Sequence, residues 1–318
     1  MVATFLIYSG WAVLTGYRGV SSCYFGFKVV TFTQRLGHYG KLMRLDKPIG
    51  ILLLLWPTLW GLWLAADGPP DMFILTVFVL GTVLMRSAGC VINDYADRNI
   101  DPHVVRTKNR PLATKAVSTK EALLLSAGLS LCAFLLILPL NRLTLELAVF
   151  ALFLAASYPF TKRFFAMPQA YLGIAFSFGI PMAFAAQTGE LPLIVWLLMA
   201  ANLLWVIAYD TEYAMVDRDD DLKIGIKTSA ITFGHFDVMG IMLCHAGFLS
   251  IMIGIGLMQK LGLAYYVGLI AASGLIIYQY RLIRKRDPVL CFRAFLHNNW
   301  VGAVVFAGIV LGYLTEAT

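Results

Sequence analysis

Nine long apolar segments constrain the fold of this chain more than any other feature. A helix needs about 20 mostly apolar residues to cross the hydrocarbon core of a bilayer. From Pro48 onward the sequence contains nine such runs, near 48–66, 72–92, 121–139, 143–161, 168–187, 191–212, 236–257, 261–280 and 296–315. Only 14% of the residues are charged, against about 25% in soluble domains. The sequence therefore predicts an all-α, polytopic membrane protein with about nine transmembrane helices.

The basic residues are distributed unevenly between the two ends of these segments. Of the 25 Lys and Arg residues, 22 lie in the N-terminal tail or in loops on the same side. Two lie on the other side, and Arg86 lies within a segment. Because cytoplasmic loops carry the excess of Lys and Arg, the long charged loops are predicted to face the cytoplasm. The net charge of +7 then reflects membrane orientation, and no nucleic-acid partner is expected.

The start of the chain is less informative. Residues 1–36 form an N-terminal extension of unclear status, and residues 37–318 are predicted to form the membrane domain. Residues 2–14 are apolar but short for a span, so a mobile extension and a surface-lying helix both stay open. Residues 42–50 mix charged and apolar side chains, which predicts an interfacial helix ahead of the first span. The five cysteines lie far apart, which argues against a disulfide framework or a thiolate metal site.

Half of the 18 acidic residues lie in two short stretches. The first, N-D-x-x-D-x-x-x-D at 93–101, closes the second span, and the other, at 209–221, closes the sixth. Four spans separate the two stretches, so both emerge on the same face of the membrane, as a weak internal duplication would produce. At 3.6 residues per turn, each stretch places oxygen ligands on one helical stripe: Asn93, Asp97 and Asp101 in the first, Asp210, Asp217 and Asp221 in the second. Pro102 disfavours helix at Asp101.

Two lines of carboxylates facing one cavity indicate a cation site. Carboxylates four residues apart repel each other unless a cation lies between them, and Mg²⁺ is commonly bound by carboxylates together with phosphate oxygens. One alternative is that these are solvated loop carboxylates. Another is an ion-coupled membrane transporter, although a transporter is expected to place its charges near mid-membrane.

Basic side chains on the same face are the second half of this pattern. Arg86 is predicted to bind a substrate carboxylate within the bilayer or to form an ion pair with an acid of the bundle. Lys162 and Arg163 lie in a loop short enough to hold them near the helix ends, where they are predicted to bind phosphate. The loop that follows the first acidic stretch carries further cations, interpreted mostly as topology signals: Arg106, Lys108, Arg110, Lys115 and Lys120.

Together these motifs carry a family resemblance. The two acidic stretches resemble those of the UbiA superfamily of intramembrane prenyltransferases, in particular the branch that prenylates 4-hydroxybenzoate in ubiquinone biosynthesis. Five segments, two of which overlap the acidic stretches, are similar to that branch: RLDKPIG at 44–50, LLLLWPTLWGLW at 52–63, AGCVINDYADR at 88–98, NRPL at 109–112 and VDRDDDLKIGIKT at 216–228. The resemblance covers about residues 38–316.

The resemblance implies nine helices around a central cavity that opens to lipid in a bacterial inner membrane. It implies Mg²⁺-dependent transfer of a polyprenyl group from its diphosphate to the ring carbon ortho to the hydroxyl of 4-hydroxybenzoate, or to another aromatic or quinone precursor. The residues that match metal and diphosphate positions are Asn93, Asp97, Asp101, Asp217 and Asp221. Arg86 matches a position near the aromatic acid, and Lys162 and Arg163 match a diphosphate-contacting pair. Asp97 or Asp217 is the expected base.

Overall fold

The computed structural model describes residues 32–161 and 163–316, and within these residues it contains helices and no strands. The helices before the acidic exit of the second span are α1 (Phe32–Leu42), α2 (Ile49–Ala65) and α3 (Met72–Ala96), followed by the 3₁₀ turn η1 (Asp101–His103). The middle of the chain forms α4 (Thr119–Ile137), α5 (Arg142–Thr161), α6 (Pro168–Ser177), α7 (Gly179–Thr188) and α8 (Leu193–Ile224). The last elements are α9 (Ser229–Phe233), η2 (Gly234–Phe236), α10 (Asp237–Met258), α11 (Leu263–Ile283) and α12 (Pro288–Glu316).

The described helices confirm the expected number of spans. Eight helical segments are long and apolar enough to cross a membrane, and the 17-residue apolar helix α2 is the ninth. The fifth span is interrupted, because α6 ends at Ser177 and α7 begins at Gly179. Pro181 lacks the N–H that would bond to the carbonyl of Ser177. A Cβ at Gly179 would clash with the hydroxyl of Thr58, so α7 packs closely on α2 at this break.

Two boundaries differ from the sequence prediction. The sixth span was expected to end near residue 212, but α8 continues to Ile224 and ends at Gly225, whose φ of 73° suits a glycine helix cap. No proline interrupts that extension, so the polar stretch stays helical. The interfacial helix expected at 42–50 is wrong: the helix is α1, which ends at Leu42, and Arg44 adopts a positive φ of 59° in the turn that follows.

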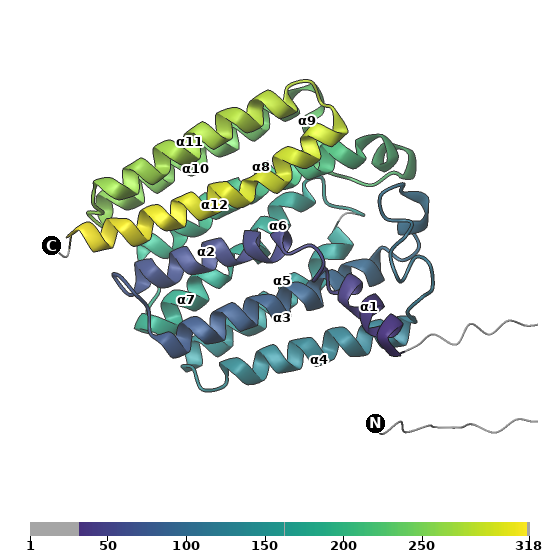
Figure 1. Cartoon of the computed structure of the whole chain (residues 1–318), viewed down its shortest axis with the longest axis horizontal. Coiled ribbons are helices and arrows are strands. Elements are labelled where there is room, and N and C mark those ends of the chain that lie inside the picture. The colour runs from purple at the N-terminus through teal and green to yellow at the C-terminus, as the bar shows by residue number, and fades with distance from the viewer. Residues whose placement is uncertain (1–31, 162, 317–318) are drawn as a thin grey trace, which may run out of the picture.

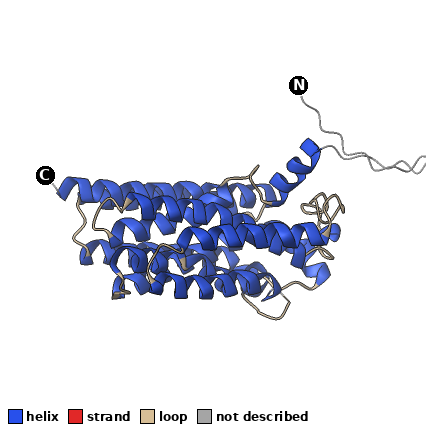
Figure 2. Ribbon diagram, turned by 90° about the horizontal axis from the view of Figure 1, so that it is seen from below, coloured by secondary structure: helices blue, strands red, loops and turns tan. Residues whose placement is uncertain are grey.

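The helices run side by side along the length of the molecule (Figures 1 and 2). In Figure 1 α10, α11 and α12 lie together in the upper half, and α3 and α4 lie in the lower half. The largest buried cluster joins α10, α11 and α12 to α2, α6, α7 and α8, and it contains Trp60 of α2, Trp205 of α8 and Phe248 of α10. The indole of Trp205 is 5.2 Å from that of Trp60 and 6.0 Å from the ring of Phe248.

The long connections gather at one end of the molecule, on the right in Figure 1, and the short ones lie at the other end. This follows from the alternation of long and short loops along a bundle of antiparallel neighbours. The C-terminal ends of α3 and α8 therefore meet at the same end as α1.

Candidate active site

A cavity of about 1330 Å³ extends from the end of the bundle that carries the long loops into its apolar interior. Besides Asp46, the acidic side chains that line it come from both stretches: Asp94, Asp97, Asp101, Asp210, Asp217, Asp220 and Asp221. Farther along α3 the wall is formed by apolar side chains such as Val77 and Phe78. Asp97 and Val77 are separated by five to six helical turns, about 30 Å. One cavity thus joins a charged site to an apolar channel.

The first acidic stretch starts on α3 and leaves the helix before it ends. Asn93 lies in the last turn, and Asp97 caps the helix with its N–H donating to the carbonyl of Asn93 at 2.9 Å. The Asn93 amide also donates to the Asp97 carboxylate at 3.2 Å, so these two side chains share the predicted stripe. Asp101 instead begins the turn η1 ahead of Pro102. The expected stripe is therefore helical only as far as Asp97.

Asp94 is the most buried carboxylate of this stretch, with no exposed surface. Arg44 reaches it from the turn before α2, and its Nη2 donates to both carboxylate oxygens at 2.7 and 2.9 Å. Nη1 of Arg110 lies 3.1 Å from the same carboxylate. Asp94 therefore ties the entry to the first span and the loop after α3 to one helix end.

Arg110 also holds Asp101. Its Nη1 donates to the two Asp101 oxygens at 3.0 and 2.9 Å, so one nitrogen lies between two carboxylates. Asp101 is only 3% exposed. This burial raises the pKa of the Asp101 carboxyl above its ordinary value, and the positive charge of Arg110 opposes that rise. A bound cation would favour the ionised form further.

The second acidic stretch lies wholly on α8. Arg106 donates to Asp217, with Nε at 3.0 Å from both carboxylate oxygens and Nη2 in a still closer contact. The guanidinium of Arg106 also lies over the ring of Tyr213, 4.5 Å from its centroid. Asp221, one turn after Asp217, is 9% exposed and lines the cavity.

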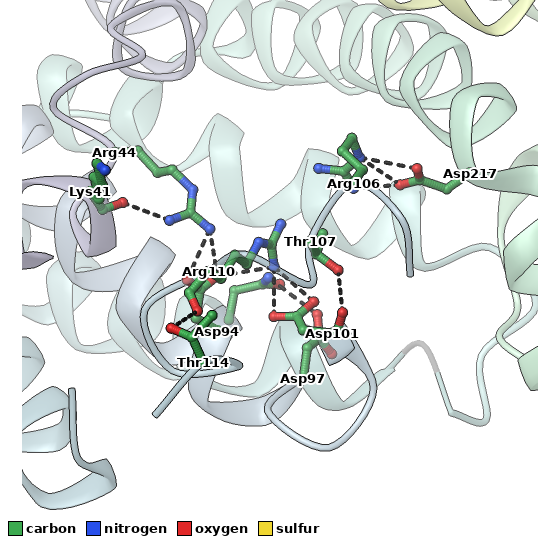
Figure 3. A network of polar contacts seen from close by, with 11 residues as sticks. Lys41, Arg44, Asp94, Asp97, Asp101, Arg106, Thr107, Arg110, Thr114 and Asp217 are labelled. Atoms are coloured by element: carbon green, nitrogen blue, oxygen red, sulfur yellow. Dashed lines mark hydrogen bonds and ion pairs between the residues drawn. The ribbon is translucent and has the colours of Figure 1, made fainter. Parts of the chain in front are cut away.

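The loop after η1 joins the two stretches (Figure 3). Arg110 pairs with Asp101 at one edge of the cavity, and Arg106 pairs with Asp217 across it. The N–H of Val105 donates to Asp220 at 3.4 Å. Sequence reasoning placed these arginines on the correct face but missed their pairing, as it missed Arg44. For Arg44 and Arg110 the available signal was their presence in the RLDKPIG and NRPL segments, whereas no such signal marked Arg106.

Arg86 lies deeper, on the cavity wall formed by α3. Its Nε donates to the carbonyl of Gly50 at 3.1 Å, and its guanidinium lies 5.5 Å from the centroid of the Phe176 ring. Among the described residues no carboxylate forms an ion pair with it. A Cβ at Gly50 would lie 2.9 Å from Nη2 of Arg86, so the glycine makes room for the guanidinium. The structure thus places a charged fork in the cavity wall with a backbone carbonyl as its polar partner.

The short loop after α5 is only partly described. Lys162 lies outside the described residues. Arg163 is exposed and donates from Nη2 to the carbonyl of Ala96 at 3.1 Å, which brings it beside Asp97 at the end of α3. Arg163 does not line the cavity in this arrangement.

The donor set suits a hard cation, although the site is not preformed. Asn93 and the aspartates offer only oxygen atoms, which Mg²⁺ prefers. Within the described ranges, no three His, Cys, Asp or Glu side chains converge closely enough to hold an ion. Asp101 and Asp217 are instead neutralised by Arg110 and Arg106. Mg²⁺ is often bound by only one or two carboxylates together with substrate phosphates. Carboxylates on the two sides of the cavity therefore still suit Mg²⁺.

This combination defines a class. A helical membrane protein with acidic helix ends facing each other over an apolar cavity is built to handle an amphipathic molecule with an anionic head. Residues 54–302 match the UbiA prenyltransferase family. The chain belongs to this family and is a multi-pass membrane protein.

Relatives and solved structures agree with that membership. The chain is 77% identical over 288 residues to 4-hydroxybenzoate octaprenyltransferase of Nitrosospira multiformis, covering 91% of this chain and 99% of the relative. The enzyme of the same name from Nitrosomonas europaea is 71% identical, with 90% and 98% covered. A UbiA homologue from Aeropyrum pernix superposes with a TM-score of 0.74 at 27% identity, over 82% of this chain and 97% of that chain. A UbiA homologue from Archaeoglobus fulgidus, bound to GPP and Mg²⁺, shares the fold with a TM-score of 0.66 at 18% identity, over 86% and 99%.

Proposed function

We propose that this protein is an aromatic prenyltransferase that moves a polyprenyl group, of octaprenyl size, from its diphosphate to 4-hydroxybenzoate. The bond forms at the ring carbon ortho to the hydroxyl, and inorganic pyrophosphate leaves. The carrying observation is the single cavity that joins both acidic stretches and Arg86 to a long apolar wall. The names of the relatives from Nitrosospira and Nitrosomonas support this choice of acceptor and donor.

We assign the diphosphate to the end of the cavity between α3 and α8. Asn93, Asp97, Asp101, Asp217 and Asp221 would hold Mg²⁺ there. When bound, the metal supplies positive charge that stabilises the departing pyrophosphate. Lys162 and Arg163 are proposed to contact the diphosphate as well. For the carboxylates to reach a metal, Arg106 has to release Asp217, which frees its guanidinium for phosphate oxygens.

Arg86 is proposed to bind the carboxylate of the aromatic acid. Its planar fork matches a carboxylate, and its pairing with a neutral carbonyl leaves its charge uncompensated by any described acid. The ring would then lie between Arg86 and the diphosphate, with its ortho carbon toward the allylic carbon. Asp97 or Asp217 is proposed to accept the proton of the phenol or the ring carbon.

The apolar wall of the cavity keeps water away from the allylic carbon of the polyprenyl diphosphate. An allylic carbon with cationic character reacts with water, so the reaction needs a site from which bulk water is kept away. The loop from Val105 to Arg110 lines the polar end of the cavity, and apolar side chains of several helices, α3 and α5 among them, line the rest. The polyprenyl chain is proposed to lie along these apolar side chains.

The cellular setting follows from the same arguments. We place the protein in a bacterial inner membrane with the acidic end facing the cytoplasm, since the Lys and Arg excess is on that end. The step belongs to ubiquinone biosynthesis in this proposal. Another aromatic or quinone precursor stays the alternative acceptor, whereas family membership argues against the transporter alternative.

Purified protein in lipid nanodiscs would test the proposal. With octaprenyl diphosphate, 4-hydroxybenzoate and Mg²⁺ we expect an ortho-prenylated acid by mass spectrometry and an equal amount of pyrophosphate, and loss of both after chelation. 4-Hydroxybenzyl alcohol, which lacks the carboxylate, is the matched acceptor control and is expected to react poorly. Faster reaction of the alcohol than of 4-hydroxybenzoate, or turnover that persists without any divalent metal, would refute the proposed function.

A further inference from the structure

Four helices behind the cavity form a bundle of their own. α11 packs on α12, α10 on α8, and α12 on α8, with α10 also touching α11 (Figure 1). On each helix one row of buried residues recurs at alternating spacings of three and four, as in the seams of helical bundles. These seams are Leu198, Ala201, Trp205, Ala208, Glu212 and Met215 on α8; Ile241, His245, Phe248, Met252 and Ile255 on α10; Tyr265, Leu269, Ala272, Ile276, Gln279 and Ile283 on α11; and Cys291, Ala294, Asn298, Val301 and Val305 on α12.

Each seam contains one acid, imidazole or amide side chain: Glu212, His245, Gln279 and Asn298. All four are at most 1% exposed. None of them lines the catalytic cavity, and the proposed reaction gives none of them a role. A polar residue in each of these otherwise apolar seams needs a physical reason, because burying a polar group without a hydrogen-bond partner destabilises the fold.

Contacts around Trp205 relate three of the four side chains. The Asn298 amide donates to Glu212 at 2.8 Å, and its oxygen accepts from the Trp205 indole at 3.0 Å. Asn298 therefore lies between Trp205 and Glu212 along α8. On α10, His245 lies one turn from Phe248, whose ring stacks on Trp205 at 6.0 Å.

The fourth helix joins these contacts through neighbouring rings. Tyr278 of α11 lies 5.0 Å from His297 of α12. Gln279 and Asn298 directly follow these residues in the sequence, and both lie in the seams of the bundle. The four polar side chains thus form one layer across the bundle, which we call the polar layer.

Protein groups do not satisfy this layer. Among the described residues, five of its buried atoms have no hydrogen-bond partner: Glu212 Oε1, His245 Nδ1 and Nε2, and Gln279 Nε2 and Oε1. These atoms include donors and acceptors from three different helices. A dry interior would leave all of them unpaired, whereas buried water typically makes two to four hydrogen bonds to such groups.

We propose that the polar layer is a buried water-binding site that holds a small cluster of water molecules between α8, α10, α11 and α12. Water bridges His245 and Gln279 to the free oxygen of Glu212, while Asn298 links that carboxyl group to Trp205. The site supports the cavity wall, because Trp205 packs edge-on against Tyr209 at 5.3 Å and Tyr209 lines the cavity. The inference does not depend on which acceptor is prenylated.

Hydroxyl-radical labelling of the whole protein in nanodiscs tests this directly. Radicals made from water by a millisecond X-ray pulse oxidise side chains that touch water. We compare the protection of His245 with that of Met252, which lies two turns away on the same seam and is equally buried. After normalisation to the unfolded chain, we expect His245 to be protected about tenfold less than Met252 if it contacts bound water. Equal protection of the two residues would overturn the proposal.

A variant locates the water. Gln279→Met conserves volume while removing both amide atoms, and Gln259→Met at the end of α10 is the matched control. We expect Gln279→Met to raise the protection of His245 toward that of Met252 and to lower the thermal midpoint, with the control unchanged in both. If the amide of Gln279 were buried without water, its removal would raise the thermal midpoint. Such a rise, or unchanged labelling of His245, would overturn the assignment of bound water to the polar layer.

Discussion

Replacing Asp94 by Asn is the most informative single perturbation of the acidic end. The carboxylate has no exposed surface and receives guanidinium groups from Arg44 and Arg110. Breaking a buried ion pair by removing one partner costs about 3–5 kcal/mol. The two arginine side chains keep 20% and 15% of their surface exposed, so water from the cavity compensates part of the loss. We therefore expect a loss of about 2–4 kcal/mol.

The corresponding fall in thermal midpoint is about 3–6 °C for a chain of this size. Thermal unfolding in one detergent at one scan rate, followed by tryptophan fluorescence, measures it. Asp219→Asn is the matched control, because Asp219 is exposed on α8 and forms no ion pair with a described residue. Arg44→Gln combined with Asp94→Asn is expected to cost less than the sum of the two single changes. A midpoint like that of the Asp219 control would refute the view that Asp94 fastens the loop and the first span to α3.

Three further predictions concern the reaction. Four of the proposed metal ligands are replaced singly by alanine: Asp97, Asp101, Asp217 and Asp221. Each variant is expected to reduce turnover by at least about tenfold, the effect of about 1.4 kcal/mol. Near-normal turnover of any two variants at normal expression would contradict a shared metal site. Arg86→Ala is expected to weaken 4-hydroxybenzoate binding by about one to two orders of magnitude, because a charge-assisted hydrogen bond is lost, and Arg86→Lys is expected to recover part of the affinity. Isothermal titration with each substrate measures the affinities. Unchanged affinity for 4-hydroxybenzoate would contradict the assignment of Arg86 to its carboxylate. Arg163→Ala is expected to raise KM for the polyprenyl diphosphate or to lower kcat, and a change confined to the aromatic acid would show that the residue acts elsewhere.

Most of the membrane architecture was predictable because it depends on local composition. An apolar run of about 20 residues must be helical in a bilayer, whatever it packs against, since its backbone polar groups can only be satisfied within the helix. The boundaries were less predictable where polar residues continue a helix. The extension of α8 to Ile224 is the clearest case, because its acidic side chains face a cavity rather than a loop.

The sequence by itself determined the spans, the face on which both acidic stretches emerge, and the stripe that Asn93 and Asp97 share, since each follows from composition or helical periodicity. Only the tertiary structure decided which carboxylates pair with which arginines. Helical periodicity separated Asp97 from Asp94 but did not show that Asp94 is enclosed by Arg44 and Arg110 while Asp97 lies next to Asn93. The partners are 50 and 16 residues away from Asp94 in the chain. Such pairing depends on where the turn before α2 and the loop after η1 come to lie once the helices have packed, and no local pattern encodes that.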